Sequence, residues 1–314
     1  MRAQTDFLRE VPDTPATYAA LARHNTMSPL SSLVYDASTR QVRFACSFPL
    51  RAEIADFSGL IFSWAAATQA SAASLLLDSD VARQIGGEPA VSSHPTSGFR
   101  SHPDDMLTLI HRELVPRGEV DSGFAEADFQ ELAATVRHSG SVLTNAGPTG
   151  LTAEFPFGGY TGLFRKLFGP KGKPHTALLT VKADRHPLLG NGCFIRLFLP
   201  LADTTERLVH LINRMNRFET EEWAYVYGIG GWCLEQTAGG WTGVCHVTFL
   251  PVVLRRGNVL QNFLAGSYSR MLAVKERFKL KAPGRSRSAQ DVDLDTVIRH
   301  VIQQRGANKR KGRP

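Results

Sequence analysis

The chain lacks the features that would place it in a membrane or in an oxidising compartment. Its 314 residues contain no run of about 18 apolar residues, so we expect no membrane-spanning helix. Residues 1–6 lack the apolar core of a secretory signal. The four cysteines, at positions 46, 193, 233 and 245, form no C-x-x-C pair and no zinc-binding spacing. These absences predict a reduced protein of the bacterial cytoplasm.

Motifs of the common enzyme classes are also missing. Gly228-Ile-Gly-Gly231 does not match G-x-G-x-x-G and opens no expected helix, which argues against nucleotide binding. The sequence contains no G-x-x-x-x-G-K-[ST], no H-E-x-x-H and no G-x-S-x-G. We therefore expect a protein that is not an enzyme and that needs no cofactor, and we interpret these glycines as a bulge or sharp bend in a strand.

Positive charge is concentrated at the end of the chain. The formal net charge is +7, but residues 275–314 alone hold twelve Lys or Arg and four Asp or Glu, a net of +8. Residues 1–274 therefore carry a net charge of −1. This distribution argues against a basic nucleic-acid groove in the folded body, and it leaves a basic tail that contacts phosphates without reading sequence.

The stretch 223–274 is the most informative part of the sequence. Its aromatic and β-branched residues predict a strand at 223–229, further extended structure at 232–237 and a returning strand at 241–249. Ala238-Gly-Gly240 supplies the hairpin turn. Pairing Thr237 with Trp241 places Cys233 opposite Cys245, Leu234 opposite Val244 and Trp232 opposite His246. Two opposed cysteines are close enough to form a disulfide, and a reduced pair packing as small apolar residues is the alternative that a reducing compartment favours.

An amphipathic helix is expected after this hairpin, with Asn258 as its N-cap. Its apolar residues recur at helical spacing and predict one face that covers the sheet: Leu260, Phe263, Leu264, Met271 and Leu272.

A shorter version of the same pattern occurs near the N-terminus. A helix at 14–24, strands at 33–36 and 41–48 and a long helix over 54–76 precede a polar linker. Both copies have a strand that ends in proline, preceded by a hairpin and followed by an apolar-striped helix. The helices before the hairpins also match, Arg23-His24-Asn25 against Arg214-Met215-Asn216. We interpret this as a partial internal repeat.

The rest of the chain completes the expected organisation. Residues 86–122 read as a polar linker with a short helix at 106–114, and residues 145–150 as a turn. Alternating apolar residues predict strands at 151–157, 177–183 and 193–199, between helices at 129–136 and 208–215. The predicted parts are an N-terminal partial repeat (1–85), the linker (86–122), a complete unit (123–280) and a basic tail (281–314) with an amphipathic helix at 290–304.

This order of elements predicts an α+β protein with antiparallel sheets flanked by helices. It resembles the type III secretion chaperone-like fold, and within it the YbjN-like branch. The resemblance rests on the hairpin that ends in Gly192-Cys-Phe-Ile-Arg196, the helix that ends in Asn213-Arg-Met-Asn216, and the strand, strand and helix after Trp223. It implies binding of other proteins through a sheet face and helix surfaces, frequently as a dimer, without a catalytic centre.

Three clusters have residue types suited to ligands. His94, His102, Asp104, Asp105, His111 and Glu113 are possible metal ligands, but they lie in the linker, where polar residues are expected anyway. A pocket joining His102, Asp104 and His111 would revive an enzyme interpretation.

The second cluster interleaves basic and aromatic residues between 164 and 175, and a solvated loop is its plainer interpretation. The third is the tail, where an amphipathic stripe (Leu294, Val297, Ile298, Val301, Ile302) precedes a basic end. Asp291, Asp293 and Asp295 at the start of that helix, with Arg299 and Arg305 near its end, suit its dipole. The candidate contacts with a protein or nucleic acid are Arg165, Lys166, Phe168, Lys171, Lys173, Lys309, Arg310, Lys311 and Arg313.

The sequence thus favours a non-enzymatic protein-binding protein, a chaperone-like protein or adaptor, whose partner is another protein or a second copy of the chain. A nucleic-acid-associated protein that uses the tail and the loop at 164–175 is the alternative.

Overall fold

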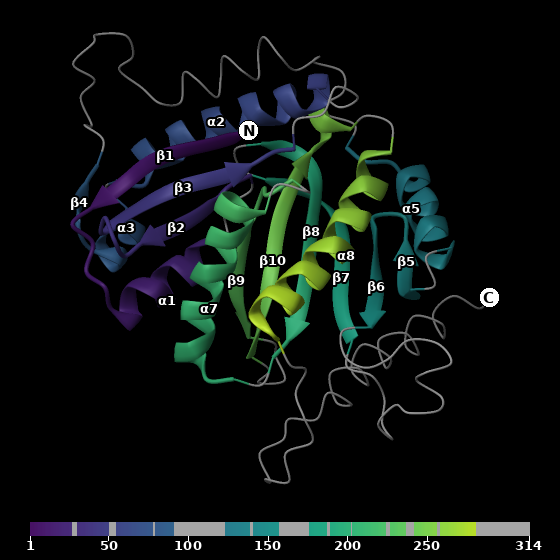
Figure 1. Cartoon of the computed structure of the whole chain (residues 1–314). Helices are drawn as coiled ribbons and strands as arrows, with labels where there is room; N and C mark the ends of the chain where they lie inside the picture. Colours follow the sequence, from purple (N-terminus) through teal and green to yellow (C-terminus); the bar gives the residue numbers. More distant parts are fainter. Residues whose placement is uncertain are drawn as a thin grey trace, which may run out of the picture.

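The chain forms an α+β structure built from two antiparallel sheets and the helices that flank them (Figure 1). The structure is a computed structural model. It describes residues 1–26, 30–49, 55–77, 79–90, 123–138, 141–156, 176–186, 189–201, 203–223, 227–236, 242–255 and 258–280.

The N-terminal part forms a four-stranded sheet, here called sheet A. Its strands, in order across the sheet, are β2 (Ser32–Asp36), β3 (Gln41–Ser47), β1 (Arg2–Arg9) and β4 (Glu88–Pro89). Its helices are α1 (Pro15–His24), α2 (Ala55–Leu75) and α3 (Asp80–Ile85). The predicted hairpin and both of its flanking helices are confirmed. In α1, Pro15 stands at the first helical position and the Thr14 hydroxyl accepts from the backbone N–H of Thr17, as an N-cap requires.

The C-terminal part forms a six-stranded sheet, sheet B. Its strands, in order, are β5 (Val142–Gly147), β6 (Gly150–Pro156), β7 (Thr176–His186), β8 (Gly190–Pro200), β10 (Thr242–Pro251) and β9 (Gly231–Gln236). Its helices are α5 (Glu126–His138), α7 (Thr205–Arg217) and α8 (Val259–Phe278). A short 3-10 turn (Val252–Leu254) leads from β10 towards α8.

The predicted register of the last hairpin is confirmed. Cys233 pairs with Cys245, Leu234 with Val244 and Trp232 with His246. The register follows from the side-chain alternation of the two strands, because a slip by one residue would turn every buried side chain to the other face.

Two local predictions are wrong. Residues 223–229 were expected to form a strand, but α7 continues into a π-helical turn (Phe218–Glu222) and the described residues after it make an isolated bridge between Gly228 and Ser47. A Cβ atom on Gly228 would lie 2.2 Å from the Ser47 hydroxyl, so glycine permits this close approach. The expected turn at 145–150 is also shorter, because β5 extends to Gly147 and β6 begins at Gly150.

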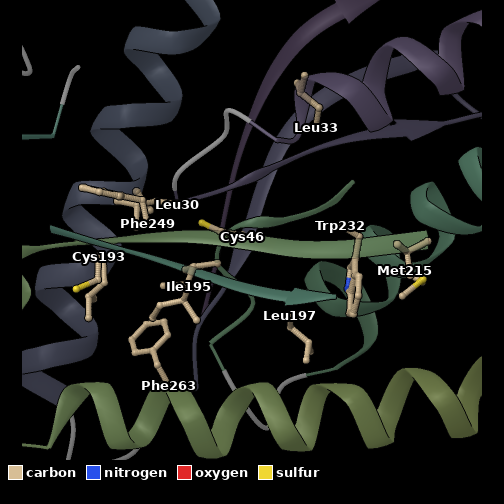
Figure 2. Packing of buried hydrophobic residues seen from close by; sticks show 14 of the residues in the cluster. Leu30, Leu33, Cys46, Cys193, Ile195, Leu197, Met215, Trp232, Phe249 and Phe263 are labelled. Carbon is tan, nitrogen blue, oxygen red and sulfur yellow. The ribbon is translucent and has the colours of Figure 1, made fainter. Parts of the chain in front are cut away.

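The core of sheet B lies between the sheet and α7 and α8. Figure 2 shows Ile195 and Leu197 pointing from β8 towards Phe263 of α8, and Met215 of α7 beside Trp232. The predicted stripe of α8 is buried at Leu260, Phe263, Leu264 and Met271, but Leu272 is 44% exposed. Leu272 therefore lies outside the buried face, and Val274 completes that face instead.

Three asparagines close the edges of the two sheets. β2 and β9 are edge strands, so the outer N–H and C=O groups of Leu33, Tyr35 and Trp232 need partners. The amide of Asn25, at the end of α1, accepts from Leu33 N (2.7 Å) and donates to Leu33 O (3.1 Å). Asn216 of α7 does the same for Trp232 (2.7 and 3.0 Å).

The third asparagine connects the two sheets. Asn213 of α7 accepts from Tyr35 N at 2.9 Å and donates to Tyr35 O at 3.0 Å, so a helix of the C-terminal part completes the edge of sheet A. Each carboxamide acts as one peptide unit of a neighbouring strand, and the edge strands are thereby closed to further strand pairing.

Candidate functional site

A buried cluster of ionisable side chains lies where the π-helical turn meets β9, β10 and α8. Glu219 of the turn accepts hydrogen bonds from the Trp232 indole N–H (2.6 Å) and from Arg270 Nε (2.8 and 2.9 Å to its two oxygens). His246 Nε2 lies 3.6 Å from the same carboxylate. Arg270 also donates to the backbone carbonyl of Tyr227 at 2.6 Å. No more than 4% of any of the side chains of Glu219, Arg270, Trp232 and His246 is exposed.

The electrostatics of this cluster follow from burial. Burial raises the pKa of Glu219, while the Arg270 guanidinium and the Trp232 N–H oppose that rise by favouring the carboxylate. Burial and the neighbouring Arg270 cation hold the pKa of His246 well below its ordinary value. We conclude that His246 is neutral at physiological pH and that Glu219 and Arg270 form the charged pair.

This cluster connects the π-helical turn to sheet A. Its groups bond to one another, and the Glu219 backbone carbonyl accepts from the Ser47 hydroxyl at 2.8 Å, which ties the turn to sheet A. Arg43 of β3 adds a second connection, because it pairs with Glu221 of the turn (2.8 Å) and with Asp36 of β2 (3.3 Å). These contacts join the turn to both strands of the β2–β3 hairpin.

The low pKa of His246 predicts a pH-dependent stability. An unfolded histidine takes up a proton below about pH 6.5, whereas folded His246, facing Arg270, Glu219 and Trp232, does not. As the pH is lowered below about 6.5, the free energy of unfolding should therefore decrease. This histidine contributes up to about 1.4 kcal/mol per pH unit to that decrease.

Urea unfolding between about pH 5 and pH 7.5 measures this dependence. The variant His246→Gln should lose that part of the slope. The matched variant His138→Gln, which changes an exposed histidine at the end of α5, should keep it. Equal slopes for all three proteins would contradict the assignment of neutral His246.

All four cysteines are free thiols. The Cys233 thiol donates to the Cys245 carbonyl at 3.1 Å, and both residues are fully buried. The hydrogen bond with the Cys233 side chain, and then burial, raise the pKa of Cys245 well above its ordinary value. Of the two alternatives for this pair, the structure contains the reduced, packed one. Because Trp232 directs its backbone groups away from β10 to Asn216, Cys233 and Cys245 form a hydrogen-bonded pair of the ladder, the kind whose Cα atoms lie about 5.5 Å apart.

The face of sheet B opposite α7 and α8 carries a row of paired residues across all six strands. Successive pairings join Val142 of β5, Glu154 of β6, Leu178 of β7, Phe198 of β8, Cys245 of β10 and Cys233 of β9. Directly paired residues share a face, so these side chains lie side by side. Val142 is 57% exposed, Leu178 and Phe198 are half-buried, and Cys245 and Cys233 at the far end of the row are fully buried. We call this set the outward row.

Charged residues border the outward row, and one end of the face is covered. Arg196 of β8 lies two residues from Phe198, on the same face, and pairs with Glu235 of β9 at 2.9 Å. At the other end of the face, Leu30 packs against Phe249 (Figure 2). The uncovered part of this face thus combines apolar side chains with a polar border, as protein-binding surfaces do.

The ligand candidates suggested by sequence lie outside the described residues. This applies to the possible metal ligands between 94 and 113, to the basic loop (Arg165, Lys166, Phe168, Lys171, Lys173) and to the tail (Lys309, Arg310, Lys311, Arg313). Within the described ranges, no three His, Cys, Asp or Glu side chains are arranged to hold a metal ion. The Glu219–Arg270 pair was not predicted, because 51 residues separate its members and both occupy positions that the apolar pattern does not mark.

Comparison with known proteins adds no family, since no family model, no curated protein and no solved structure matches the chain. Across the helices of the described ranges, none has the length and apolar character that a membrane crossing requires.

Proposed function

We propose that this chain is a non-enzymatic protein-binding protein, a chaperone-like protein or adaptor, and that the outward row is its contact surface. The observation that carries the proposal is the row itself, which leaves Val142, Leu178 and Phe198 partly accessible on the sheet face opposite α7 and α8. Covering such side chains with a partner removes apolar surface from water, worth about 1.5–3 kcal/mol for each large residue fully buried.

Substitutions in the outward row test this function. Leu178→Glu and Val142→Glu should each weaken retention of a protein partner by at least about tenfold, because each places a charge in a buried apolar contact. Gln4→Glu, an exposed change on a strand of sheet A, is the matched control and should retain the partner.

The measurement is affinity capture with the full chain, followed by titration of each captured protein against the purified variants. Retention of the same proteins by wild type and both row variants would contradict the proposal. Capture of nucleic acid alone, weakening steeply with salt, would favour the alternative based on the basic residues at 164–175 and in the tail.

The internal repeat and the chaperone-like unit belong to this proposal. The order β8, α7, β9, β10, α8 parallels β1, α1, β2, β3, α2. Asn25 and Asn216 each bond to the strand that follows their helix. These parallels support two related units in one chain. A second copy of the chain, implied by the resemblance, and a cytoplasmic location are part of the same proposal.

A further inference from the structure

The two related units have matching strand orders and matching edge contacts. The first unit consists of β1, α1, β2, β3 and α2, and the second of β8, α7, β9, β10 and α8. Their strands lie side by side in the same order, β2-β3-β1 in sheet A and β9-β10-β8 in sheet B. Asn25 holds Leu33 through the same two backbone hydrogen bonds by which Asn216 holds Trp232. Leu33 and Trp232 are therefore equivalent positions.

The strand pairings carry this equivalence to the middle strands. Phe44 of β3 and His246 of β10 lie directly opposite the two residues that the asparagines hold. Ser47 and Phe249, three residues further along these strands, are therefore equivalent as well.

The two units meet at equivalent positions of their edge strands. Ser32 and Gly231 directly precede Leu33 and Trp232, so they are equivalent too. A Cβ atom added to Gly231 would lie 3.2 Å from the Cβ of Ser32 and 3.2 Å from the side chain of Asn25. In an assembly with two-fold symmetry, a residue meets its own equivalent only at the axis. The axis that relates the two units therefore passes between β2 and β9.

The helices beside this axis make reciprocal contacts. α1 lies against β9, and α7 lies against β2, where Asn213 holds Tyr35 (Figure 1). The two helices also contact each other, with the rings of Tyr18 and His210 centred 4.0 Å apart. Such an exchange of contacts is the property that defines an isologous interface.

The segments that lead into the edge strands repeat the exchange. Leu30, just before β2, packs against Phe249 of the other unit (Figure 2). Gly228, just before β9, exchanges backbone hydrogen bonds of 2.9 and 3.0 Å with Ser47 of the other unit. Because Phe249 and Ser47 are equivalent, each unit places its lead-in segment at the same position of the other unit.

We propose that the two units pair about an internal two-fold axis, as two copies do in a homodimer, and that each unit is the partner of the other at this surface. The surface made by α1, β2 and their counterparts is filled within one chain, so a second copy binds only elsewhere, for example at the outward row. This inference takes up the two related units proposed above and does not depend on a protein partner.

A protease site inserted between Asp104 and Asp105 of the full chain tests the pairing, because cleavage there leaves the units joined only by their contacts. In analytical ultracentrifugation at about 1 μM, the cleaved wild-type protein should sediment as one particle with the mass of the intact chain. Gly231→Leu should weaken the pairing at least about tenfold, because its side chain enters the contact at the axis. Gly266→Leu, at a glycine of α8 with open space around it, is the matched control and should leave the pairing unchanged.

A second variant tests the pairing without adding a bulky side chain. Asn213→Ala should weaken it at least about fivefold, because the backbone groups of Tyr35 lose their partner in the paired state and are hydrated when the units separate. Asn262→Ala, at an exposed position of α8, should have no effect.

Three outcomes would overturn the proposal. The first is separation of the cleaved wild-type pieces at about 10 μM. The second is pairing that neither Gly231→Leu nor Asn213→Ala weakens. The third is a dimer of the uncleaved chain that Gly231→Leu dissociates and Leu178→Glu does not, because a second copy would then fill the surface.

Discussion

Replacing Arg270 with methionine is expected to lower the free energy of unfolding by roughly 3–5 kcal/mol. The substitution removes the cation that faces Glu219 and leaves a carboxylate buried without its counter-charge. The Trp232 N–H still donates to that carboxylate, but one neutral donor does not offset the cost of burying the charge. Chemical denaturation followed by tryptophan fluorescence and by circular dichroism measures the loss.

Two further observations separate this cause from loss of packing. In Arg270→Met the pKa of Glu219 rises further, so the folded state holds a proton that the unfolded state has released. The destabilisation should therefore be larger at about pH 8 than at about pH 5. The double variant Glu219→Gln with Arg270→Met removes the charge and keeps an acceptor for Trp232, so it should recover at least half of the loss. A single variant within about 1 kcal/mol of wild type would refute the importance of the pair.

Substituting Asn216 with leucine should cost roughly 2–4 kcal/mol, the second-largest effect we expect. The change leaves the N–H and the C=O of buried Trp232 without the partners that the Asn216 amide supplies. Each unsatisfied buried group costs about 1–3 kcal/mol. Asn262→Leu is the matched control, because Asn262 is exposed on α8, and it should change the free energy by less than about 0.5 kcal/mol.

The same variant should also change how the protein behaves in solution. An uncapped β9 presents free backbone groups at the edge of sheet B, which is a template for pairing with another chain. Asn216→Leu should therefore form concentration-dependent oligomers in size-exclusion chromatography, while Asn262→Leu stays as wild type. A stable, monodisperse Asn216→Leu protein would show that the helix covers the edge without the amide.

The sequence predicts those elements of this fold whose side chains alternate or recur at helical spacing. The register of β9 and β10 was predicted from side-chain alternation and an expected turn, and it is confirmed at Cys233 and Cys245. Strand β1 was missed because Arg2, Gln4 and Asp6 are polar and exposed and only a few apolar residues mark its buried side. The strand expected at 223–229 failed because local aromatic propensity gave way to a π-helical turn that carries Glu219 into the core.

In the candidate site, too, features with a local sequence pattern could be predicted, and features that depend on tertiary contacts could not. The strands that carry Glu154, Leu178 and Phe198 were predicted, but β5 with Val142 was not, and aligning the row needs five pairings, two of them across sequence gaps whose lengths do not encode a register. The edge asparagines gave one signal, the match of Asn25 with Asn216 in the two helix endings. Nothing local marks Asn213, whose partner Tyr35 lies in the other sheet.

That last contact has a consequence for the nascent chain on the ribosome. Tyr35 obtains its side-chain partner from a residue 178 positions later, so β2 is synthesised long before the amide that closes it exists. At about 5–20 residues per second, the interval is roughly 10–35 s. During that time the edge strand of the N-terminal sheet presents unpaired backbone groups to any extended polypeptide nearby. Faster elongation, or a chaperone that holds the nascent chain, would shorten the exposure of these groups.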